Sequence, residues 1–373
     1  MNCSGCSACA AVCPRECIQM KLNSEGFLYP ETDREKCINC SLCKKVCPYE
    51  TSEKVSLDDG VLYSAHSLCD DIRKTTSSGG IGFCLAKQYK ERNFAVCGAY
   101  YDYKQNCVRH AVSEDIERFK GSKYLQSMSA EGFRDFYNEI KKNDRKGILF
   151  GTPCQIAGLD NVLKSVGIRE QVLLVDIYCH GVPSYLLWRN YLKWLDDKKG
   201  ISKEQIENIS FRDKKFSWHS YYMHIKTKEK EYICDREADP FLKIFTMGIV
   251  NRRECITCQF RNASCADIRL GDFWGKRYKD SEEGFSMVIA LTDRGREAIS
   301  SLKEIELFEC DIKERFGQQH TDYPFPEYYL QTIEMLKNKT SLKKIISLYE
   351  PVTVRIKRKV RKSLNKIAGS VRF

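Results

Sequence analysis

The sequence predicts three parts: a small α+β domain at the N-terminus, a larger mixed α/β core, and a basic amphipathic helix at the C-terminus. Three observations support this fold class. A twelve-residue pattern rich in cysteine occurs twice within the first 50 residues. From residue 61 to about residue 200, short apolar segments alternate with longer amphipathic ones, as in βαβ units. The final residues carry an apolar stripe among lysines and arginines.

The length and composition indicate a globular protein. The chain has 373 residues, enough for two or three domains, and is 42% hydrophobic and 30% charged. No apolar run reaches the roughly 18 residues of a membrane-spanning helix, and no secretory leader precedes the first cysteine. We therefore expect a cytoplasmic protein whose 20 cysteines serve metal binding or redox chemistry, because disulfides are rare in a reducing compartment.

The cysteine repeat is the most specific motif in the chain. The stretches "CSGCSACAAVCP" (residues 3–14) and "CINCSLCKKVCP" (37–48) have the same spacing. Three cysteines spaced CxxCxxC can hold three corners of an iron–sulfur cube, and a fourth followed by proline reaches the other cluster in two-cluster ferredoxins. We therefore predict two 4Fe–4S clusters in a ferredoxin-like domain. The ligands expected are Cys3, Cys6, Cys9 and Cys47 for one cluster, and Cys37, Cys40, Cys43 and Cys13 for the other.

A zinc site or a disulfide framework fits this repeat less well. Zinc sites usually place two CxxC pairs farther apart, and disulfides disagree with the expected compartment. Cys17 lies outside the pattern, and we expect it to be a packing residue. Between the repeats, "IQMKL" and "FLYP" predict a short hairpin with its turn at residues 23–26.

A second group of cysteines lies in the core. Residues 146–198 read as strand, helix, strand and helix, a βαβα unit whose two strands should be parallel neighbours. Cys154 and Cys179 follow the ends of these strands, where ligand sites of open parallel sheets gather. With Cys255 and Cys258 of a later CxxC, they could hold a third 4Fe–4S cluster or a zinc ion. The alternative is that each is a small buried hydrophobic residue.

Several motifs together resemble a known family. "SSGG", "GSKYLQS", "GTPCQIAGL", "YCHGVPS", "FRDK", a later CxxC and "DIRLGDFWG" are similar to the family named for the β subunit of coenzyme F-420 hydrogenase/dehydrogenase, over roughly residues 58–320. The resemblance implies an iron–sulfur flavoprotein that carries FAD and a core cluster and exchanges electrons between them. Relatives act on the deazaflavin coenzyme, reduce chlorophyll precursors, or belong to gene clusters for surface polysaccharide biosynthesis. One departure is Ser217, where the family has glycine before the tryptophan.

These observations divide the chain. We predict the ferredoxin domain over residues 1–50, a polar linker over 51–60, the N-terminal α/β region of the family over 61–150, its C-terminal region over 151–322, and a helical, basic tail over 323–373. The fold class is thus an α+β ferredoxin-like two-cluster domain followed by a mixed α/β flavoprotein core. Within the core, residues 94–103 and 107–113 predict a hairpin.

The FAD site follows from the resemblance, since the chain has no GxGxxG fingerprint. The residues are consistent with it. A helix start after "TTSSGG" offers hydroxyls and free backbone N–H groups to a pyrophosphate, and "GSKY" offers a hydroxyl, an ammonium and an aromatic face. The alternative is that the first stretch only begins a helix. The candidate cofactor residues are Ser77, Ser78, Gly79, Gly80, Ser122, Lys123 and Tyr124.

His180 is the candidate catalytic residue, because it follows Cys179 and its usual pKa near neutrality suits proton delivery. It could equally hydrogen-bond a cluster sulfur or cap the turn. Arg212 and Lys214 of "FRDK" could bind an anionic substrate or a cofactor phosphate, or form a surface ion pair. We expect an oxidoreductase whose substrate is a small or lipid-linked molecule or the deazaflavin coenzyme. The alternatives are an electron-transfer module that feeds a separate catalytic partner, and a catalytically silent scaffold.

The C-terminal tail is strongly basic. From Arg355 onward it carries +8 of the net charge of +11 and no acid, with an apolar stripe formed by Ile356, Val360, Leu364, Ile367 and Val371. Such a helix can lie on an anionic membrane surface, which would place a lipid-linked substrate near the protein. A terminal helix docked on its own domain, or a nucleic-acid arm, are the alternatives. Because the rest of the chain carries little net charge, we expect no nucleic-acid partner.

Overall fold

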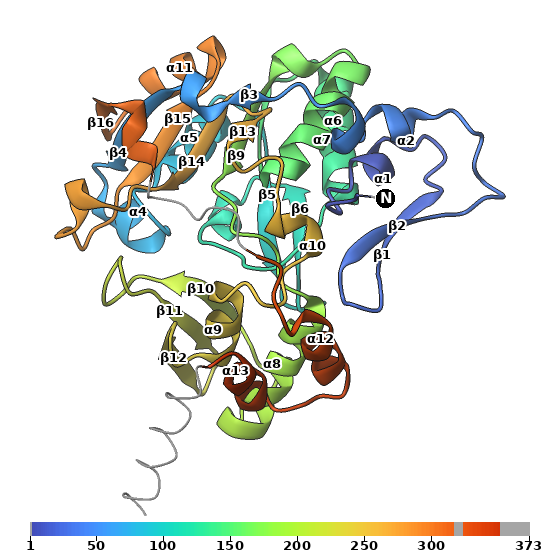
Figure 1. Cartoon of the computed structure of the whole chain (residues 1–373). Coiled ribbons are helices and arrows are strands. Elements are labelled where there is room, and N and C mark those ends of the chain that lie inside the picture. Colours follow the sequence, from blue (N-terminus) through green and yellow to red (C-terminus); the bar gives the residue numbers. More distant parts are fainter. Residues whose placement is uncertain (1, 317–323, 351–373) are drawn as a thin grey trace, which may run out of the picture.

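The structure, a computed structural model, describes residues 2–316 and 324–350. The cysteine-rich N-terminus forms helix α1 (Ala8–Val12), the antiparallel hairpin of β1 (Ile18–Leu22) and β2 (Leu28–Thr32), and two short helices, α2 (Leu42–Lys45) and α3 (Pro48–Thr51). The predicted hairpin is confirmed, and the Asn23 side chain fixes its turn by accepting hydrogen bonds from the backbone N–H groups of Glu25 and Phe27. Figure 1 shows this domain at the side of the core.

The sequence repeat extends to the backbone of the two cysteine loops. Ser7 and Ser41, at equivalent positions, both have left-handed φ angles of 69° and 62°. Gly5 and Asn39, also equivalent, have φ angles of 68° and 54°. Glycine and asparagine adopt this conformation more readily than other residues. The two loops therefore wrap in the same way before α1 and α2.

The core is built on a nine-stranded mixed sheet with the order β16-β4-β15-β14-β9-β8-β5-β6-β7. Its strands are β4 (Val61–Ser67), β5 (Ala95–Asp102), β6 (Cys107–Val112), β7 (Ser127–Met128), β8 (Gly147–Gly151), β9 (Val172–Ile177), β14 (Ile268–Asp272), β15 (Ser286–Ala290) and β16 (Ile305–Cys310). Strands β5, β8, β9 and β14 are parallel neighbours, and β15 runs antiparallel to both β14 and β4. The carboxyl ends of β4, β14, β9, β8 and β5 therefore share one edge.

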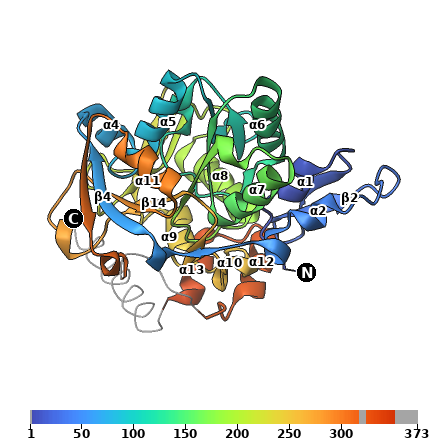
Figure 2. The same cartoon turned by 90° about the horizontal axis from the view of Figure 1, so that it is seen from above.

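Helices cover both faces of this sheet, as Figure 2 shows from above. Alternate residues of β9 face opposite ways: Leu174 packs with α6 (Ala130–Asn143) and α7 (Pro153–Ser165), whereas Leu173 packs with α5 (Ile81–Glu91) and α11 (Asp293–Ser300). Helix α4 (Asp70–Thr75) precedes α5. Helix α1 of the N-terminal domain belongs to the same apolar cluster as α6 and α7. The cysteine-rich domain is therefore part of the layer that covers the sheet.

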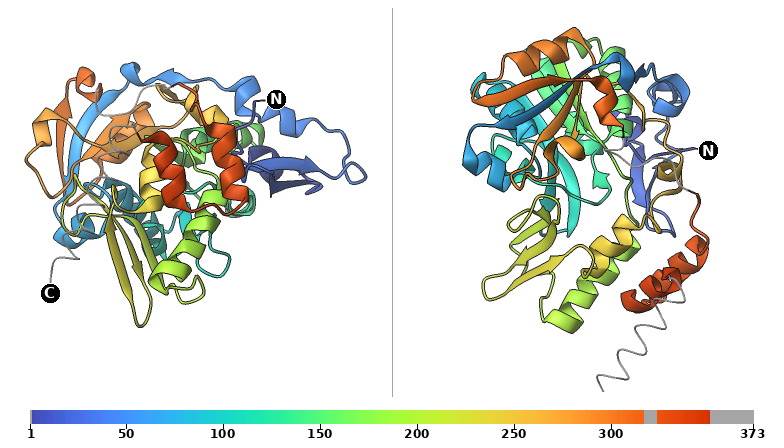
Figure 3. Two further views of the ribbon diagram at one scale, coloured as in Figure 1. Left: turned by 60° about the horizontal axis from the view of Figure 1, so that its bottom comes forward. Right: turned by 60° about the vertical axis from the view of Figure 1, so that its left-hand side comes forward.

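A smaller lobe has a core rich in aromatic residues. It consists of the three-stranded sheet β10 (Asn208–Asp213), β11 (Tyr222–Lys226) and β12 (Glu231–Asp235), with α8 (Tyr185–Lys199), α9 (Pro240–Thr246), α12 (Tyr329–Lys337) and α13 (Leu342–Tyr349). Figure 3 shows α12 and α13 beside α8 and α9. Trp188, Phe211 and Phe241 are fully buried and contact one another with ring centroids 5.1–5.8 Å apart.

The segment that we predicted as a linker, residues 51–60, is held on the core. It contains β3 (Val55–Ser56), which pairs with β13 (Ala263–Ser264), and the 3₁₀ turn η1 (Leu57–Asp59), whose Leu57 is fully buried. Helix α10 (Arg253–Ile256) and the 3₁₀ turns η2 (Ile116–Phe119), η3 (Arg169–Gln171), η4 (Lys276–Tyr278) and η5 (Ile312–Arg315) complete the described elements. The connection therefore restricts how the cysteine-rich domain can move.

The other elements expected from the sequence are placed as follows. The βαβα unit is β8-α7-β9-α8, with β8 and β9 parallel as predicted, and the hairpin of residues 94–113 is β5-β6. The basic residues and the apolar stripe predicted for the tail, from residue 355 onward, lie outside the described residues. None of the helices in the described parts of the chain is long and apolar enough to span a membrane.

Candidate functional site

The thiols of the first repeat lie together with one thiol of the second. Burial raises the pKa of Cys3, and Glu254 and then Cys47 raise it further. The pKa of Cys9 rises to about 12, chiefly through burial and then through Cys3, Cys43 and Cys47. Cys47 precedes α3, which begins with Pro48. The last cysteine of the second repeat thus sits beside the first loop, the crossed arrangement expected for the first cluster.

The remaining thiols form an outer group. The sulfurs of Cys13 and Cys17 are 3.3 Å apart. The hydrogen bond with Cys13 raises the pKa of Cys17 to about 11, and Cys37 also contributes. Cys40 is exposed, and Cys43 is half-buried. Cys17 is buried, as a packing residue would be, but it is also a fifth thiol beside this group.

Four further thiols converge in the core. Cys154 lies in the first turn of α7, Cys179 two residues after β9, Cys255 in α10 and Cys258 just beyond it. Burial, followed by Cys154, raises the pKa of Cys179 to about 12, with a smaller contribution from Cys258. Burial likewise raises the pKa of Cys255, reinforced by Cys179 and Cys154. Cys179 and Cys258 line the same cavity of about 20 Å³.

A buried ion pair holds this part of the core together. Arg269 of β14 lies opposite Asp176 of β9 in the parallel register, and its Nε and Nη2 atoms each donate to the Asp176 carboxylate at 2.7 Å. Both side chains are almost fully buried. Arg269 also donates to the carbonyl oxygens of Phe260 and Arg261, in the loop after Cys258. The CxxC loop is therefore fastened to the strand that leads to Cys179.

The three thiol groups fit iron–sulfur clusters in their chemistry. Each supplies at least four thiols, the ligand set of a 4Fe–4S cluster. Metal binding would displace the thiol protons that burial favours. Within residues 2–316 and 324–350, no three His, Cys, Asp or Glu side chains are close enough to hold one metal ion.

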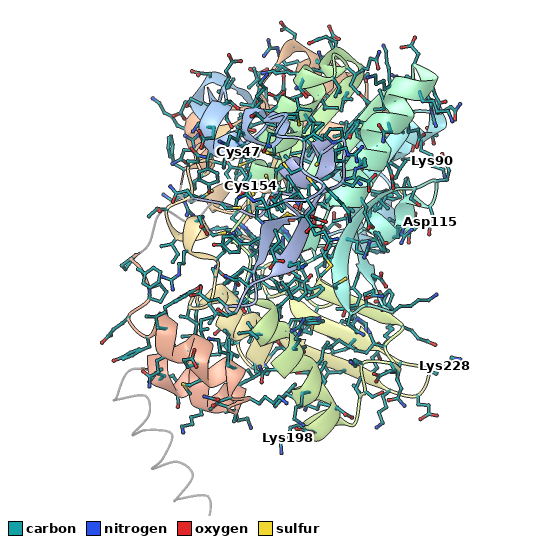
Figure 4. The ribbon with its side chains drawn as sticks, turned by 90° about the vertical axis from the view of Figure 1, so that its right-hand side faces the viewer. Cys47, Lys90, Asp115, Cys154, Lys198 and Lys228 are labelled. Carbon is teal, nitrogen blue, oxygen red and sulfur yellow. The ribbon has the colours of Figure 1, made fainter. Side chains whose placement is uncertain are left out.

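The first thiol group of the N-terminal domain, here called the inner group, lies next to the thiols of the core. The inner group consists of Cys3, Cys6, Cys9 and Cys47, and the core thiols are Cys154, Cys179, Cys255 and Cys258. Burial is the main reason that the pKa of Cys6 lies well above its usual value. The thiol of Cys154 makes the next largest contribution and also raises this pKa. Gly158 of α7 permits this approach, because a Cβ atom there would lie 3.1 Å from the Cys6 sulfur and 2.7 Å from the Ala8 Cβ. Figure 4 shows Cys47 and Cys154 in the same region of this face.

Hydrogen bonds fix the same contact. Arg252 is fully buried, and it donates to the carbonyl oxygens of Cys3 (Nε, 2.8 Å) and Leu28 (Nη1, 2.9 Å). Its guanidinium lies 4.0 Å from the ring centre of Tyr29. Gln126 accepts from the Leu28 N–H at 2.9 Å and donates to the Ser4 carbonyl at 3.2 Å. The cysteine-rich domain and the core are therefore joined by a buried polar interface.

The candidate cofactor motifs meet at the carboxyl edge of the sheet. Ser77 Oγ accepts from the Ser122 N–H at 2.9 Å, and the two hydroxyl oxygens are 2.9 Å apart. Both serines are half-buried. No side chain caps the start of α5 at Gly80. The first N–H groups of a helix attract an anion, so this hydroxyl pair and helix start fit a phosphate-bearing ligand.

The other motif residues have structural contacts. A Cβ atom at Gly79 would lie 2.4 Å from the Ala65 carbonyl, and one at Gly80 would lie 2.7 Å from Ile72. Ser78 Oγ donates to the Phe285 carbonyl at 2.7 Å. The two glycines are thus required by packing, whether or not a ligand binds.

Lys123 and Tyr124 also face protein groups. The Lys123 ammonium donates to the carbonyl oxygens of Phe119 and Lys120 at 2.8 and 2.7 Å, and burial lowers the pKa of this amine to about 7. The Tyr124 ring stacks on Phe245 with centroids 4.6 Å apart. Their direct contacts in the structure are therefore with the protein.

His180 lies where β9 opens toward the smaller lobe. The side chains of His180 and Ile177 are exposed, although β9 is an interior strand of the sheet. Burial of the imidazole by protein atoms lowers the pKa of His180. The Asp272 carboxylate raises this pKa, and the positive charges of Arg212 and Arg261 lower it further. The histidine is therefore surrounded by protein atoms while solvent still reaches it, as expected at the edge of a ligand site.

Arg212 and Asp272 connect the two lobes beside His180. Two nitrogens of Arg212 donate to the two carboxylate oxygens of Asp272, and Trp218 Nε1 donates to Asp272 Oδ1 at 3.0 Å. Trp218 stacks on Trp274 with centroids 4.6 Å apart. Arg212 is buried and Asp272 half-buried, so the "FRDK" arginine has a structural partner in the "GDFWG" motif.

Lys214 joins the smaller lobe to the helix start. Its ammonium donates to the carbonyl oxygens of Ser78 and Glu283 at 2.6 and 2.9 Å, and burial lowers the pKa of this amine to about 8. The motifs that resembled one family in the sequence therefore surround one edge of the sheet. Sequence reasoning assigned no role to Gly158 and Arg269, although they lie in "GTPCQIAGL" and "DIRLGDFWG", and it missed Arg252, which lies in no quoted motif.

The fold and the thiol groups define an iron–sulfur protein in which a small cysteine-rich domain is docked on an α/β core. Residues 2–51 match the 4Fe-4S dicluster domain. Residues 144–314 match the C-terminal region of the coenzyme F420 hydrogenase/dehydrogenase beta subunit. The family is related to the oxidoreductase subunits of hydrogenases and dehydrogenases, which indicates a redox function.

Comparison with solved structures gives a distant relative. A chain of the xenon-derivatised F420-reducing NiFe hydrogenase complex from Methanosarcina barkeri is 17% identical, and the alignment covers 79% of this chain and 92% of that chain with a TM-score of 0.48. A comparison with curated proteins found no match.

Proposed function

We propose that this protein is an iron–sulfur flavoprotein oxidoreductase that passes electrons between 4Fe–4S clusters and FAD, and so reduces or oxidises an organic substrate or a deazaflavin coenzyme. The observation that carries the proposal is the packing of Cys6 and Ala8 against Gly158 of α7, the helix whose first turn holds Cys154, which brings the dicluster domain against the thiols of the core. Electrons can pass directly from a domain docked in this way to the core. A freely tethered domain would first have to reach the core by diffusion.

The proposed ligands fall into three sets. The first set is Cys3, Cys6, Cys9 and Cys47, the second is Cys13, Cys37, Cys40 and Cys43, and the third is Cys154, Cys179, Cys255 and Cys258. The proximity of Cys47 to Cys3 and Cys9 supports the crossed assignment of the first two. The convergence of two strand ends and one CxxC loop supports the third.

For FAD, the proposed contacts are the paired hydroxyls of Ser77 and Ser122 and the N–H groups at the start of α5. Bound there, FAD would supply the conversion between one-electron and two-electron chemistry. His180 lies at the same edge of the sheet with solvent access, so its imidazole can hold or release a proton toward a bound substrate. The Arg212–Asp272 pair orients the two lobes around this edge.

Cofactor counts on anaerobically purified protein test the proposal. We expect about 12 iron and 12 sulfide per chain, from three clusters of four irons, together with one flavin. The double variant Cys154→Ser/Cys179→Ser should retain about 8 iron, because the first two sets remain complete. Zinc in place of iron, or a preparation without flavin, would contradict the proposal. A holoprotein whose flavin is not reduced when its clusters are reduced would also contradict it.

The alternative is an electron-transfer subunit that feeds a separate catalytic partner. It would require the same clusters and the same docked domain, so turnover separates the two functions. Oxidation or reduction of the deazaflavin coenzyme by the isolated chain favours the enzyme. Electron transfer only after a second subunit is added favours the module.

Contact with an anionic membrane surface, with a lipid-linked substrate in a polysaccharide pathway, stays a prediction from the sequence. Deleting residues 353–373 should abolish binding to vesicles that contain anionic lipid. Unchanged vesicle binding by the deletion variant would remove the idea.

A further inference from the structure

The two cysteine loops of the dicluster domain differ in their hydroxyl groups, although their cysteine spacing is the same. Ser4 and Ser7 lie in the first loop, and Ile38 and Ser41 occupy the equivalent positions of the second. Ile38 is 58% exposed, and Ser41 is exposed as well. The first loop therefore carries two hydroxyls among the inner thiols, whereas the second carries one, on an exposed residue.

Both hydroxyls of the first loop are buried without a hydrogen-bond partner. Ser7 is 1% exposed as a residue, and the Oγ atoms of Ser4 and Ser7 are both buried. Among residues 2–316 and 324–350, no group forms a hydrogen bond with either oxygen. Ser7 stands at the N-cap of α1, where a serine usually accepts from a backbone N–H of the first turn, yet its side chain makes no such bond. A buried hydroxyl without a partner loses its hydrogen bonds to water and gains none in return, so both serines require an acceptor.

The surroundings of the loop favour sulfur as this acceptor. The backbone N–H of Gly5, between the two serines, donates to the Cys3 sulfur at 3.4 Å. The carbonyl oxygens of Cys3 and Ser4 accept from Arg252 and Gln126 of the core. The loop carries three of the four inner thiols, and the sulfur atoms of an iron–sulfur cluster accept hydrogen bonds. A cluster on the inner group would thus supply acceptors beside both serines.

We propose that the hydroxyls of Ser4 and Ser7 donate hydrogen bonds to sulfur atoms of the inner cluster and raise its reduction potential. The inference rests on the proposed function, because it requires a 4Fe–4S cluster on the inner group. Reduction by one electron adds a negative charge to the cluster, and hydrogen bonds become stronger as the charge on the acceptor increases. The hydroxyls therefore stabilise the reduced form more than the oxidised form.

The two hydroxyls act against the effect of burial. The inner group is covered by α7, and surroundings of low dielectric constant disfavour the charge that reduction adds. The outer group has an exposed cysteine, Cys40, and its loop offers no buried hydroxyl at the equivalent positions. Ser4 and Ser7 thus offset part of the penalty of burial, so that the inner cluster can exchange electrons with the outer one.

Removal of single hydroxyls, with a control at the equivalent position, tests the proposal. The potential of each cluster is measured by redox titration of the anaerobic holoprotein, followed by EPR spectroscopy. The test variants are Ser4→Ala and Ser7→Ala, and the control is Ser41→Ala. Ser7 and Ser41 have left-handed φ angles of 69° and 62°, so alanine makes the same demand on the backbone at both positions.

Cluster-deletion variants assign the EPR signals. Cys40→Ser removes a ligand of the outer cluster, and Cys154→Ser/Cys179→Ser removes two ligands of the core cluster. The signal that remains in both variants belongs to the inner cluster.

The expected result is a more negative potential of the inner cluster alone. In Ser7→Ala the ratio of reduced to oxidised inner cluster at a fixed solution potential should fall by about 10-fold, which equals about 59 mV for a one-electron couple. Ser4→Ala should shift the ratio in the same direction. Ser41→Ala should leave the outer cluster within about 2-fold, because an exposed hydroxyl keeps its hydrogen bonds to water. In ENDOR spectra of the reduced protein, each test variant should lack one proton coupling that exchange into D2O removes from the parent.

Two results would overturn the proposal. One is an unchanged inner potential in both Ser4→Ala and Ser7→Ala, and the other is an equal shift in Ser7→Ala and in the control Ser41→Ala. Because the two serines are tested separately, a variant that fails to assemble its clusters leaves the other to decide. Iron and sulfide counts separate these outcomes from a failure of the proposed function. Parent protein that lacks clusters contradicts the function, while fully loaded variants with unchanged potentials contradict only the role of the hydroxyls.

Discussion

Arg252 of the core binds Cys3 of the dicluster domain through the main chain: its Nε atom donates to the Cys3 carbonyl oxygen at 2.8 Å, and its Nη2 atom donates to the same oxygen. The side chain is fully buried, and its Nε atom lies 3.1 Å from a carboxylate oxygen of Glu254. Glu254 in turn accepts from the Cys3 N–H and from the Tyr29 hydroxyl. The Arg252–Glu254 ion pair of the core therefore supplies hydrogen-bond partners to the Cys3 carbonyl oxygen, the Cys3 N–H and the Tyr29 hydroxyl.

Removing this arginine should destabilise the docked domain. Arg252→Met leaves the largely buried Glu254 carboxylate without its cationic partner and the carbonyl oxygens of Cys3 and Leu28 without the arginine donor, so the free energy of unfolding should fall by about 3–5 kcal/mol. Denaturant unfolding of the holoprotein measures this. The neighbouring Arg253→Met is the control, since Arg253 is 44% exposed and pairs with Glu25 near the surface. Such a pair contributes about 1 kcal/mol or less. Equal losses would show that Arg252 does not hold the interface.

A methyl group at Gly158 should separate the inner thiols from the core thiols. Alanine in a helix interior is favoured over glycine by about 1 kcal/mol, so Gly158→Ala would stabilise an isolated helix. Here the new Cβ would lie 2.7 Å from Ala8 and 3.1 Å from the Cys6 sulfur, and the loop must move. We expect full iron content with weaker magnetic coupling between the two clusters in the EPR spectrum of reduced protein. Ser165→Ala, on the exposed side of α7, should leave the coupling unchanged. Unaltered coupling in Gly158→Ala would argue against a route through this contact.

Cys17 should be able to replace Cys13. The two sulfurs are 3.3 Å apart, so a small movement of the Cys17 side chain brings its thiolate to the position that Cys13 would occupy. Cys13→Ser should therefore keep about 8 iron in the dicluster domain, and Cys17→Ser should do the same. The double variant Cys13→Ser/Cys17→Ser should lose about 4 iron. Loss of a cluster in Cys13→Ser alone would show that Cys17 cannot reach it.

His110 should make the fold sensitive to acid. Its ring is buried between the Ser127 hydroxyl at 2.7 Å and the Phe150 carbonyl at 3.1 Å, and burial lowers the pKa of His110 to about 4. The unfolded chain has the ordinary value of about 6.5, so it binds a proton first as the pH falls. Stability is therefore fully present above about pH 6.5 and decreases by about 3 kcal/mol down to pH 4. In His110→Gln this part of the pH dependence should disappear. A variant with the same acid sensitivity as the parent would assign it to other groups.

Some of the fold was open to prediction and some was not. The alternation of short apolar and longer amphipathic segments predicted the β8-α7-β9-α8 unit and the β5-β6 hairpin, because side-chain periodicity is a local property. The division into nine strands of one sheet was not predicted. β14 and β15 pair with strands that are more than 80 residues away in the chain, and no local pattern specifies such partners.

The candidate site divides in the same way. Spacing predicted the two thiol sets of the repeat, because iron–sulfur ligands can come from short loops with fixed intervals. The third set was predicted from two strand ends and a later CxxC, with buried packing residues as the alternative. Spacing could not show that Gly79 and Gly80 are needed for packing, that Lys123 donates to carbonyl oxygens, or that Cys17 lies beside Cys13. Those features depend on which surfaces meet.

The sequence by itself determined the two equivalent cysteine loops and the mixed α/β core that follows them. Both results follow from local constraints, namely the distance between neighbouring cysteines and the period of apolar residues. Only the tertiary structure decided that the dicluster domain is fastened to the core at Arg252 and Gly158, with Cys6 packed against α7 and Cys40 exposed. The physical reason is that an interface forms between surfaces distant in sequence, so its close contacts and buried hydrogen bonds exist only after the chain has folded.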